Sequence, residues 1–125
     1  MDESTHLKLP YIMPSQGLKH LTHNEALARL DALVQLAVLD RDLAAPPGSP
    51  VEGDRYIVAA GATGAWTGWS GDVACFVGGA WLRLVPREGW VAFVVDEASL
   101  LYWSGGWQDL GGTLTAGTTR VLAAG

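Results

Sequence analysis

The sequence predicts an α+β fold: an extended N-terminal arm, one long α-helix packed on an antiparallel β-meander or small barrel, and an extended C-terminal tail. Three observations predict it. Residues 22–40 repeat apolar side chains at helical spacing, residues 43–53 form a proline- and glycine-rich linker, and the chain from 54 to 110 consists of short strand-like runs separated by turns. The expected organisation is an arm over residues 1–21, one domain over residues 22–110 and a Gly/Thr-rich tail over residues 111–125.

The arm carries two prolines, Pro10 and Pro14, on either side of an apolar segment. A proline disfavours helical angles in the residue before it, so this segment is expected to be extended. The apolar side chains of Tyr11 and Ile12 then need a surface to pack on. We predict that they lie in an interface with another subunit.

The predicted helix begins at Thr22, where the spacing to Glu25 is that of a capping box. Leu27, Leu30 and Val34 then recur at three- and four-residue steps and line one face. Further apolar residues fall outside this stripe, so more than half of the helix circumference is apolar. Such a helix lies either deep in its own domain or between its own sheet and a neighbouring subunit. The second arrangement is favoured, and it makes Leu27, Leu30 and Val34 candidate oligomer-interface residues.

The segment after the linker is predicted to form an antiparallel meander. The pair Gly78-Gly79 is a hairpin signal, because both central residues of that turn need positive φ. The predicted strands are residues 54–60, 72–77, 80–84, 90–95, 100–103 and 107–110. Short strands joined in sequence by tight turns favour a single meander.

The tail, GGTLTAGTTRVLAAG, has too little bulk to form a core element. It is either a flexible end or a segment that adds as an edge strand to a partner. The second alternative makes Thr118, Val121 and Leu122 the candidate attachment residues.

Composition and charge exclude several classes of function. The formal net charge is −5 and no basic run is present, which disfavours binding to a nucleic-acid backbone. No apolar run approaches the ~20 residues needed to cross a bilayer. The acidic start of the chain is unlike a signal peptide. We therefore expect synthesis in the cytoplasm, no membrane insertion, no nucleic-acid partner and no cofactor.

Candidate catalytic and metal-binding residues are few, and an enzyme is not expected. Cys75 lies in an apolar strand, where a thiol is normally inert. His20 and His23 permit a metal site, but polar histidines at a helix start more often serve the surface. Asp54 and Asp72 are a possible hydrolytic pair, but an aspartate after a glycine is usually part of a turn.

The aromatic residues are the better indication of a ligand. All six tryptophans follow the linker. Exposed indole rings beside polar loops can stack on the flat faces of sugars, although packing in a core or interface is their commoner role. The candidate glycan-binding residues are Trp66, Trp81 and Trp107.

Four separate blocks of sequence carry a resemblance to a known family. They are QGLKHLTHNEAL (residues 16–27), PVEGDRYIV (50–58), GATGAW (61–66) and PREGW (86–90). These blocks resemble, in order, a domain-of-unknown-function family encoded in prophages and gene transfer agents. The resemblance extends from about Leu9 to Leu110, and Leu18 departs from the polar residue expected after Gln16.

This resemblance implies a component of a phage-like particle, associated with a head spike or tail fibre that engages cell-surface polysaccharide. A short member is expected to be an oligomeric base or adaptor that mounts a receptor-binding fibre. Its partners would be copies of itself, capsid or tail proteins and the fibre. The alternative is that the domain itself binds the polysaccharide. The resemblance transfers no catalytic residues.

Overall fold

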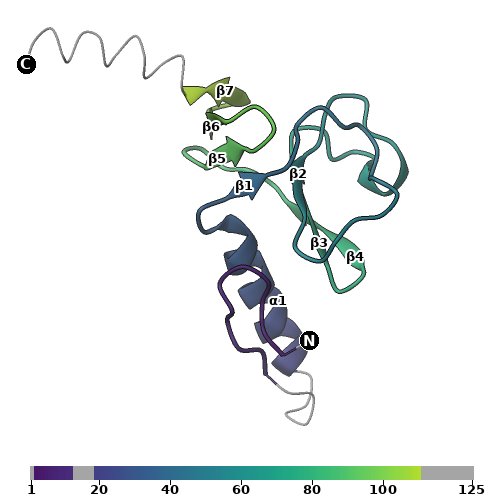
Figure 1. The fold of residues 1–125 in the computed structure, drawn as a ribbon, viewed down its shortest axis with the longest axis vertical. Helices are drawn as coiled ribbons and strands as arrows, with labels where there is room; N and C mark the ends of the chain where they lie inside the picture. The colour runs from purple at the N-terminus through teal and green to yellow at the C-terminus, as the bar shows by residue number, and fades with distance from the viewer. Residues whose placement is uncertain (1, 13–18, 111–125) are drawn as a thin grey trace, which may run out of the picture.

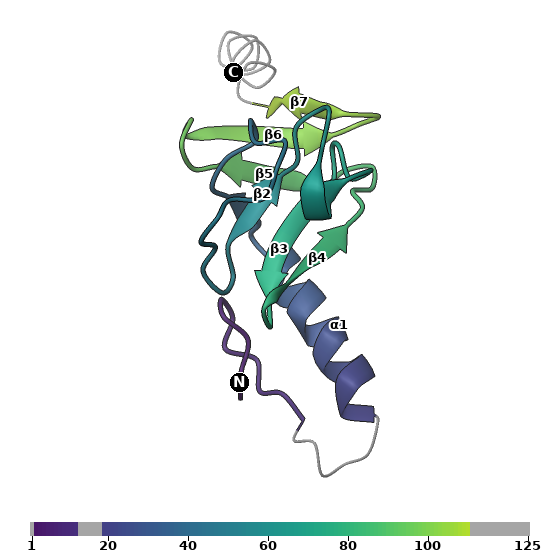
Figure 2. The same cartoon turned by 90° about the vertical axis from the view of Figure 1, so that its right-hand side faces the viewer.

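The computed structural model describes residues 2–12 and 19–110 of the chain, and these residues form a mostly β structure. It contains one helix of 15 residues and two sheets, of four and three strands (Figures 1 and 2). The helix extends away from the strands and does not lie across a single meander (Figure 2). The predicted α+β fold with one long helix on one meander is therefore wrong. The elements are α1 (Lys19–Leu33), β1 (Ala37–Val38), β2 (Arg55–Ile57), the 3₁₀ turn η2 (Gly64–Trp66), β3 (Val73–Val77), β4 (Ala80–Leu84), β5 (Val91–Val94), β6 (Ser99–Trp103) and β7 (Trp107–Asp109).

Helix α1 differs from the prediction at both ends. It begins at Lys19, so Thr22 lies inside the helix and not at its cap. It ends at Leu33, and Gln35 follows with a positive φ of 51°. A left-handed residue just after the last turn is a common way to terminate a helix.

The apolar residues after the helix belong to strand β1. Leu36 and Val38 are buried and Leu39 is exposed, which is the two-residue alternation of a strand. The backbone N–H of Phe93 donates to the carbonyl of Leu36, and that of Val95 donates to Val38. A short apolar run fits either a helix or a strand, and here the partner strand β5 decides between them.

The strands lie close to their predicted positions, but they divide between two sheets. The four-stranded sheet has the order β1-β5-β6-β7, in which β1 pairs with β5 in parallel and the other pairs are antiparallel. The three-stranded antiparallel sheet has the order β2-β3-β4. The hairpin predicted between β3 and β4 is confirmed, because Gly78 and Gly79 have φ values of 61° and 81°.

The two sheets differ in how their faces are buried. The inner faces of both sheets meet in one core, which contains Leu36, Val38, Ile57, Val73, Cys75, Leu84, Ala92, Val94 and Leu101. The outer face of the three-stranded sheet is covered as well, because Tyr56 and Ala74 pack beneath Trp66. In contrast, β5 alternates between buried and exposed residues. Its sheet therefore has one buried face and one open face.

Within residues 2–12 the N-terminal arm is folded back on itself, so this part of the chain is not the extended segment that was predicted. Glu3 pairs with Pro10 in an antiparallel bridge, and the N–H of Tyr11 donates to the carbonyl of Asp2. The loop of this arm encloses the carboxylate of Asp31 on α1. The arm therefore packs on its own helix.

Across residues 2–12 and 19–110, no helix has both the length and the apolar character needed to span a membrane.

Candidate functional site

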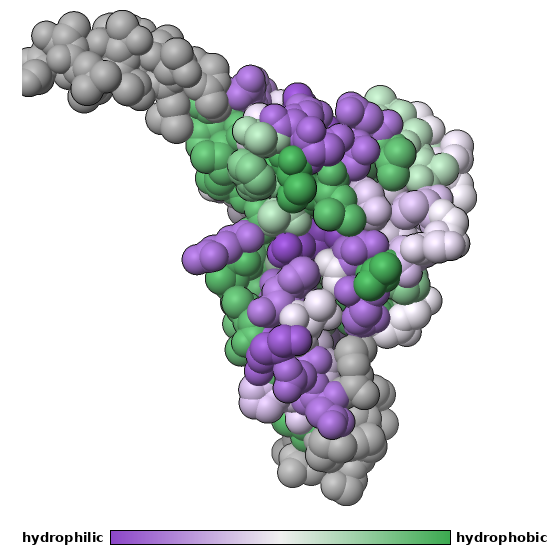
Figure 3. Space-filling view, in the orientation of Figure 1, coloured by the Kyte–Doolittle hydropathy of each residue, from purple (hydrophilic) through white to green (hydrophobic). Residues whose placement is uncertain are grey.

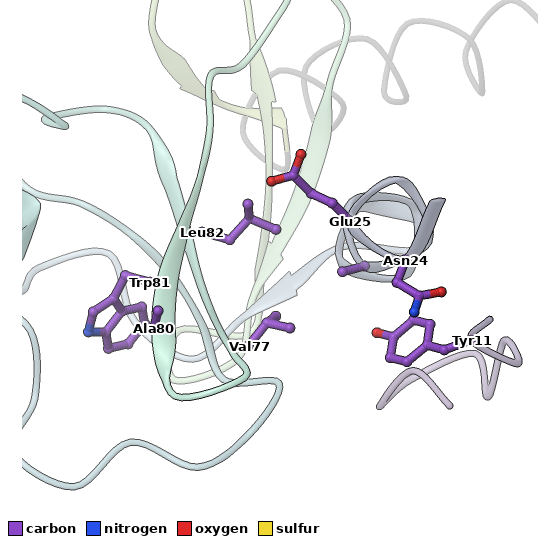
Figure 4. Close-up of a pocket in the computed structure, with 8 residues that line it drawn as sticks. Tyr11, Asn24, Glu25, Val77, Ala80, Trp81 and Leu82 are labelled. Atoms are coloured by element: carbon purple, nitrogen blue, oxygen red, sulfur yellow. The ribbon is translucent and has the colours of Figure 1, made fainter. Parts of the chain in front are cut away.

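An open hollow lies between the arm, helix α1 and the β3–β4 hairpin (Figure 4). It has a volume of about 460 Å³. Val77 and Leu82 point from the hairpin toward the helix, while the ring of Trp81 lies on the other side of the strand. The residues around it are Tyr11, Asn24, Glu25, Ala28, Val77, Ala80, Trp81 and Leu82. Its walls are mainly apolar, and Glu25 supplies its one carboxylate.

Asn24 fixes the arm at the rim of this hollow. Its side-chain oxygen accepts from the N–H of Ile12 at 2.8 Å, and its amide nitrogen donates to the carbonyl of Ile12 at 2.9 Å. The amide thus uses one donor and one acceptor position on the backbone of a single residue. Asn24 therefore acts here as an anchor for the arm.

The three candidate glycan-binding tryptophans do not form one site. Trp66 is fully buried and offers no face to a ligand. The ring of Trp81 makes an edge contact with Trp66 at 5.1 Å between centroids. Trp107 lies in the other sheet, where it contacts Trp103 and donates from Nε1 to the carbonyl of Gly71 at 2.8 Å. The structure thus uses these rings in packing.

The predicted interface residues of the helix have different exposures. Leu30 is 48% exposed and Val34 is 38% exposed, while Leu27 is half-buried. The helix instead buries Ala28, Asp31 and Ala32 against the rest of the chain. Small residues allow close approach on the inner side, so the bulkier side chains remain outside. We call the pair Leu30 and Val34 the helix shoulder.

The other predicted contact residues lie in the N-terminal arm and in the C-terminal tail. Tyr11 and Ile12 are half-buried in the arm, beside the helix of their own chain. The candidate attachment residues Thr118, Val121 and Leu122 lie outside the described residues.

The four-stranded sheet has an exposed apolar face that was not predicted from the sequence. We call it the open sheet face, and its exposed residues are Leu39, Val91, Phe93, Val95 and Leu100. Phe93 lies opposite Leu100 in the β5–β6 ladder, so the two side chains are direct neighbours. In Figure 3, hydrophobic side chains gather over the region of β5 to β7 and continue beside helix α1. Residues 90–95 (WVAFVV) are apolar at every position, so the sequence shows a strand here but does not show which of its two faces is exposed.

A second hollow, of about 440 Å³, connects the open sheet face to the end of the helix. On one side it is lined by Leu33, Gln35 and Leu36, and on the other by Val91, Phe93 and Leu100, with Gly89 at its end. Val34 of the helix shoulder lies between Leu33 and Gln35 in the sequence, beside this hollow. The open sheet face and the helix shoulder are therefore two parts of one apolar region.

Three carboxylates meet at one end of the open sheet face. Single oxygens of Asp40, Asp42 and Asp96 lie within 4.8 Å of one another. They come together because β1 and β5 are parallel and end at the same edge. The side chain of Asp96 is exposed, and its pKa is raised by partial loss of hydration and by the charges of Asp40, Glu97 and Asp42. Carboxylate oxygens are the ligands that Ca²⁺ and Mg²⁺ prefer, but exposed acidic clusters are common without an ion.

The candidate hydrolytic aspartates both have structural contacts. Asp54 accepts a bond from the N–H of Val51 at 2.8 Å, which is turn chemistry. Asp72 is buried and pairs with Arg83 at 2.7 Å. Of the candidate metal residues, His23 is exposed, and the side chain of His20 lies outside the described part of the chain.

Cys75 lies on β3 within the core between the two sheets. Burial raises the pKa of its thiol to about 12. The thiolate is the reactive form, so we expect no reaction with a thiol reagent in the native protein at pH 8 and complete reaction in denaturant. Rapid labelling of the native protein would contradict this prediction.

Cys75→Ser is expected to cost about 1–3 kcal/mol of unfolding free energy, because it buries an unpaired hydroxyl.

Comparison with known proteins gives one family. A family model described as a protein of unknown function (DUF2793) matches residues 23–108. The comparison with curated proteins found no match. The matched segment contains most of helix α1 and both sheets, and so includes the helix shoulder and the open sheet face.

Proposed function

This chain belongs to the DUF2793 family of proteins of unknown function, and we propose that it is a non-enzymatic structural component of a phage-like particle. In this proposal it forms an oligomeric base or adaptor of a head spike or tail fibre, in a gene transfer agent or prophage particle, and mounts a receptor-binding fibre. Its partners are copies of itself, capsid or tail proteins and the fibre. It is made in the bacterial cytoplasm and ends on the particle surface.

One observation supports this proposal most directly: a large apolar region is left uncovered by the described residues, 2–12 and 19–110. The helix shoulder and the open sheet face expose seven large apolar side chains, namely Leu30, Val34, Leu39, Val91, Phe93, Val95 and Leu100. Contiguous exposed apolar surface is typical of a protein that binds another macromolecule. A subunit of a symmetric assembly needs such a surface in every copy. The link to a phage-like particle comes from the sequence resemblance alone.

The first test is the mass of the purified chain and of its Leu30→Asp variant. We expect an oligomer for the native chain and a smaller species for Leu30→Asp, because a carboxylate in a dry contact is costly unless it is paired. The side chain of Leu30 is half exposed in the single chain, so the variant should keep its fold. Native mass spectrometry and light scattering measure the mass, and circular dichroism checks the fold.

Val85→Asp is the matched control for this test. Val85 is 56% exposed and lies outside the helix shoulder and the open sheet face. We expect its oligomer to be unchanged. A native chain that is monomeric at all accessible concentrations would contradict the proposed function, and so would imaging in which labelled chain is missing from purified particles.

Glycan binding by the domain itself is the competing outcome. It predicts saturable quenching of tryptophan fluorescence by host polysaccharide. With Trp66 buried, the quenched ring would have to be one of the half-buried ones, such as Trp81 or Trp107. Trp81→Phe and Trp107→Phe variants would then identify it.

A further inference from the structure

We propose that a second copy of this chain packs on the open sheet face, with the two β5 strands antiparallel across a two-fold axis. This inference rests on the proposed function and assigns the interface within the oligomer. The open sheet face is apolar throughout its centre, where Val91, Phe93 and Leu100 stand side by side. A self-complementary contact places the same patch on both subunits, and an apolar patch meets an identical apolar patch without leaving polar groups unpaired.

The size of the contact explains why the helix shoulder belongs to it. A stable interface buries about 800 Å² on each partner, so a contact that covers the helix shoulder as well as the open sheet face comes closer to this size. The hollow of about 440 Å³ joins that face to the turn that follows α1. Bulky side chains of a second copy can fill this hollow, and the contact then extends to Val34 and Leu30. The candidate interface residues of the helix and the sheet thus form one surface.

The charges at the two ends of β5 fix the relative direction of the copies. The end after β5 carries the acidic group of Asp40, Asp42 and Asp96. Nearby, Arg41 already pairs with Glu97 at 2.8 Å. None of the three carboxylates makes an ion pair within residues 2–12 and 19–110.

The opposite end of β5 carries Arg87. Its guanidinium makes no ion pair or side-chain hydrogen bond within residues 2–12 and 19–110, whereas the other described arginines bond to Glu25, Glu97, Ala32 or Asp72. Its neighbour Glu88 accepts a bond from the hydroxyl of Ser104. An antiparallel arrangement brings Arg87 of one copy to the acidic group of the other, at both ends of the contact. A parallel arrangement would place the two acidic groups together, which is unfavourable.

Disulfide trapping tests this geometry in the full-length chain. Arg87→Cys and Asp96→Cys are made as two separate proteins, mixed and oxidised. We expect a covalent dimer from the mixture and about tenfold less from either protein alone, because a disulfide requires Cα atoms within about 7 Å. Native Cys75 does not interfere, since it is buried in the core. Covalent dimers from either single variant alone would overturn the antiparallel arrangement.

A second variant tests the face itself. Phe93→Asp should weaken the oligomer at least about 30-fold, the loss expected for a residue at the centre of an interface. The side chain of Phe93 is 38% exposed, so the fold should survive, and Val85→Asp again serves as the control. An oligomer that resists Phe93→Asp and gives no mixed disulfide would overturn this interface while leaving the proposed function intact. A monomeric native chain would overturn the proposed function as well.

The chain's own tail is the other candidate occupant of the open sheet face. A Phe93→Cys/Val121→Cys double variant distinguishes it. An intrachain disulfide in that variant, formed in high yield, would show that the tail covers the face and would overturn the proposal.

Discussion

Trp66→Ala is expected to lower the unfolding free energy by about 3–5 kcal/mol, the range for removing a large aromatic side chain from a core. Trp66 has no exposed surface. Its ring contacts Tyr56 and Trp81 at centroid distances of 5.7 and 5.1 Å, and it covers the outer face of the three-stranded sheet. A domain of this size has only about 5–15 kcal/mol of stability in total, so the variant should be close to unfolding. Urea denaturation followed by circular dichroism measures the loss.

Trp66→Phe is the matched control for this prediction. It keeps most of the ring and removes Nε1–H, which has no hydrogen-bond partner among the described residues. The loss of packing and the removal of an unpaired donor partly offset each other, so we expect a cost below about 2 kcal/mol. Equal losses in Trp66→Phe and Trp66→Ala would show that the ring does not act through packing.

Asp31→Ala is expected to detach the N-terminal arm and to cost about 1–3 kcal/mol, because it leaves the buried hydroxyl of Ser4 and two part-buried backbone N–H groups without an acceptor. The carboxylate of Asp31 accepts from the hydroxyl of Ser4 at 2.6 Å and from the backbone N–H groups of His6 and Leu7. Limited proteolysis should then cut near the N-terminus before the rest of the domain. The control is Glu25→Ala on the same helix, where an exposed pair with Arg29 is worth little. An arm that stays protected in Asp31→Ala would contradict this role.

The same site predicts a dependence of stability on pH. Burial of the Asp31 carboxylate alone would raise its pKa, but hydrogen bonds from Ser4, Leu7 and His6 outweigh burial and lower the pKa below 3.8. A group with a depressed pKa in the folded state stabilises that state above its unfolded pKa, and the contribution is lost as the pH falls toward the folded value. We therefore expect the stability difference between the native chain and Asp31→Asn to be full above about pH 5 and to shrink below about pH 4. A difference that does not change across this range would show that Asp31 is not ionised in the folded chain.

The sequence located the strands well because their signals are local. Glycines that require positive φ mark the β3–β4 turn, and short apolar runs bounded by turns mark the other predicted strands. It did not show which strands share a sheet, because pairing depends on contacts between residues far apart in the chain. The helix was extended too far for the same reason: residues 36–39 form apolar spacing that fits either structure, and β5 makes them a strand.

For the candidate contact residues, too, the sequence predicted one part and the tertiary structure decided the other. The sequence by itself predicted that residues 22–40 carry more apolar side chains than one small sheet can cover, and it placed Leu27, Leu30 and Val34 on that surface. In the described residues Leu30 and Val34 are exposed and Leu27 is half-buried. Only the tertiary structure showed where the rest of that surface lies. Trp66 is buried because it packs on the outer face of the three-stranded sheet, whereas Phe93 is exposed because no element of the described residues packs on the outer face of the four-stranded sheet. A strand with apolar residues on both faces can bury either face. The tertiary structure decides which one is buried, because burial depends on which sheet faces pack against each other.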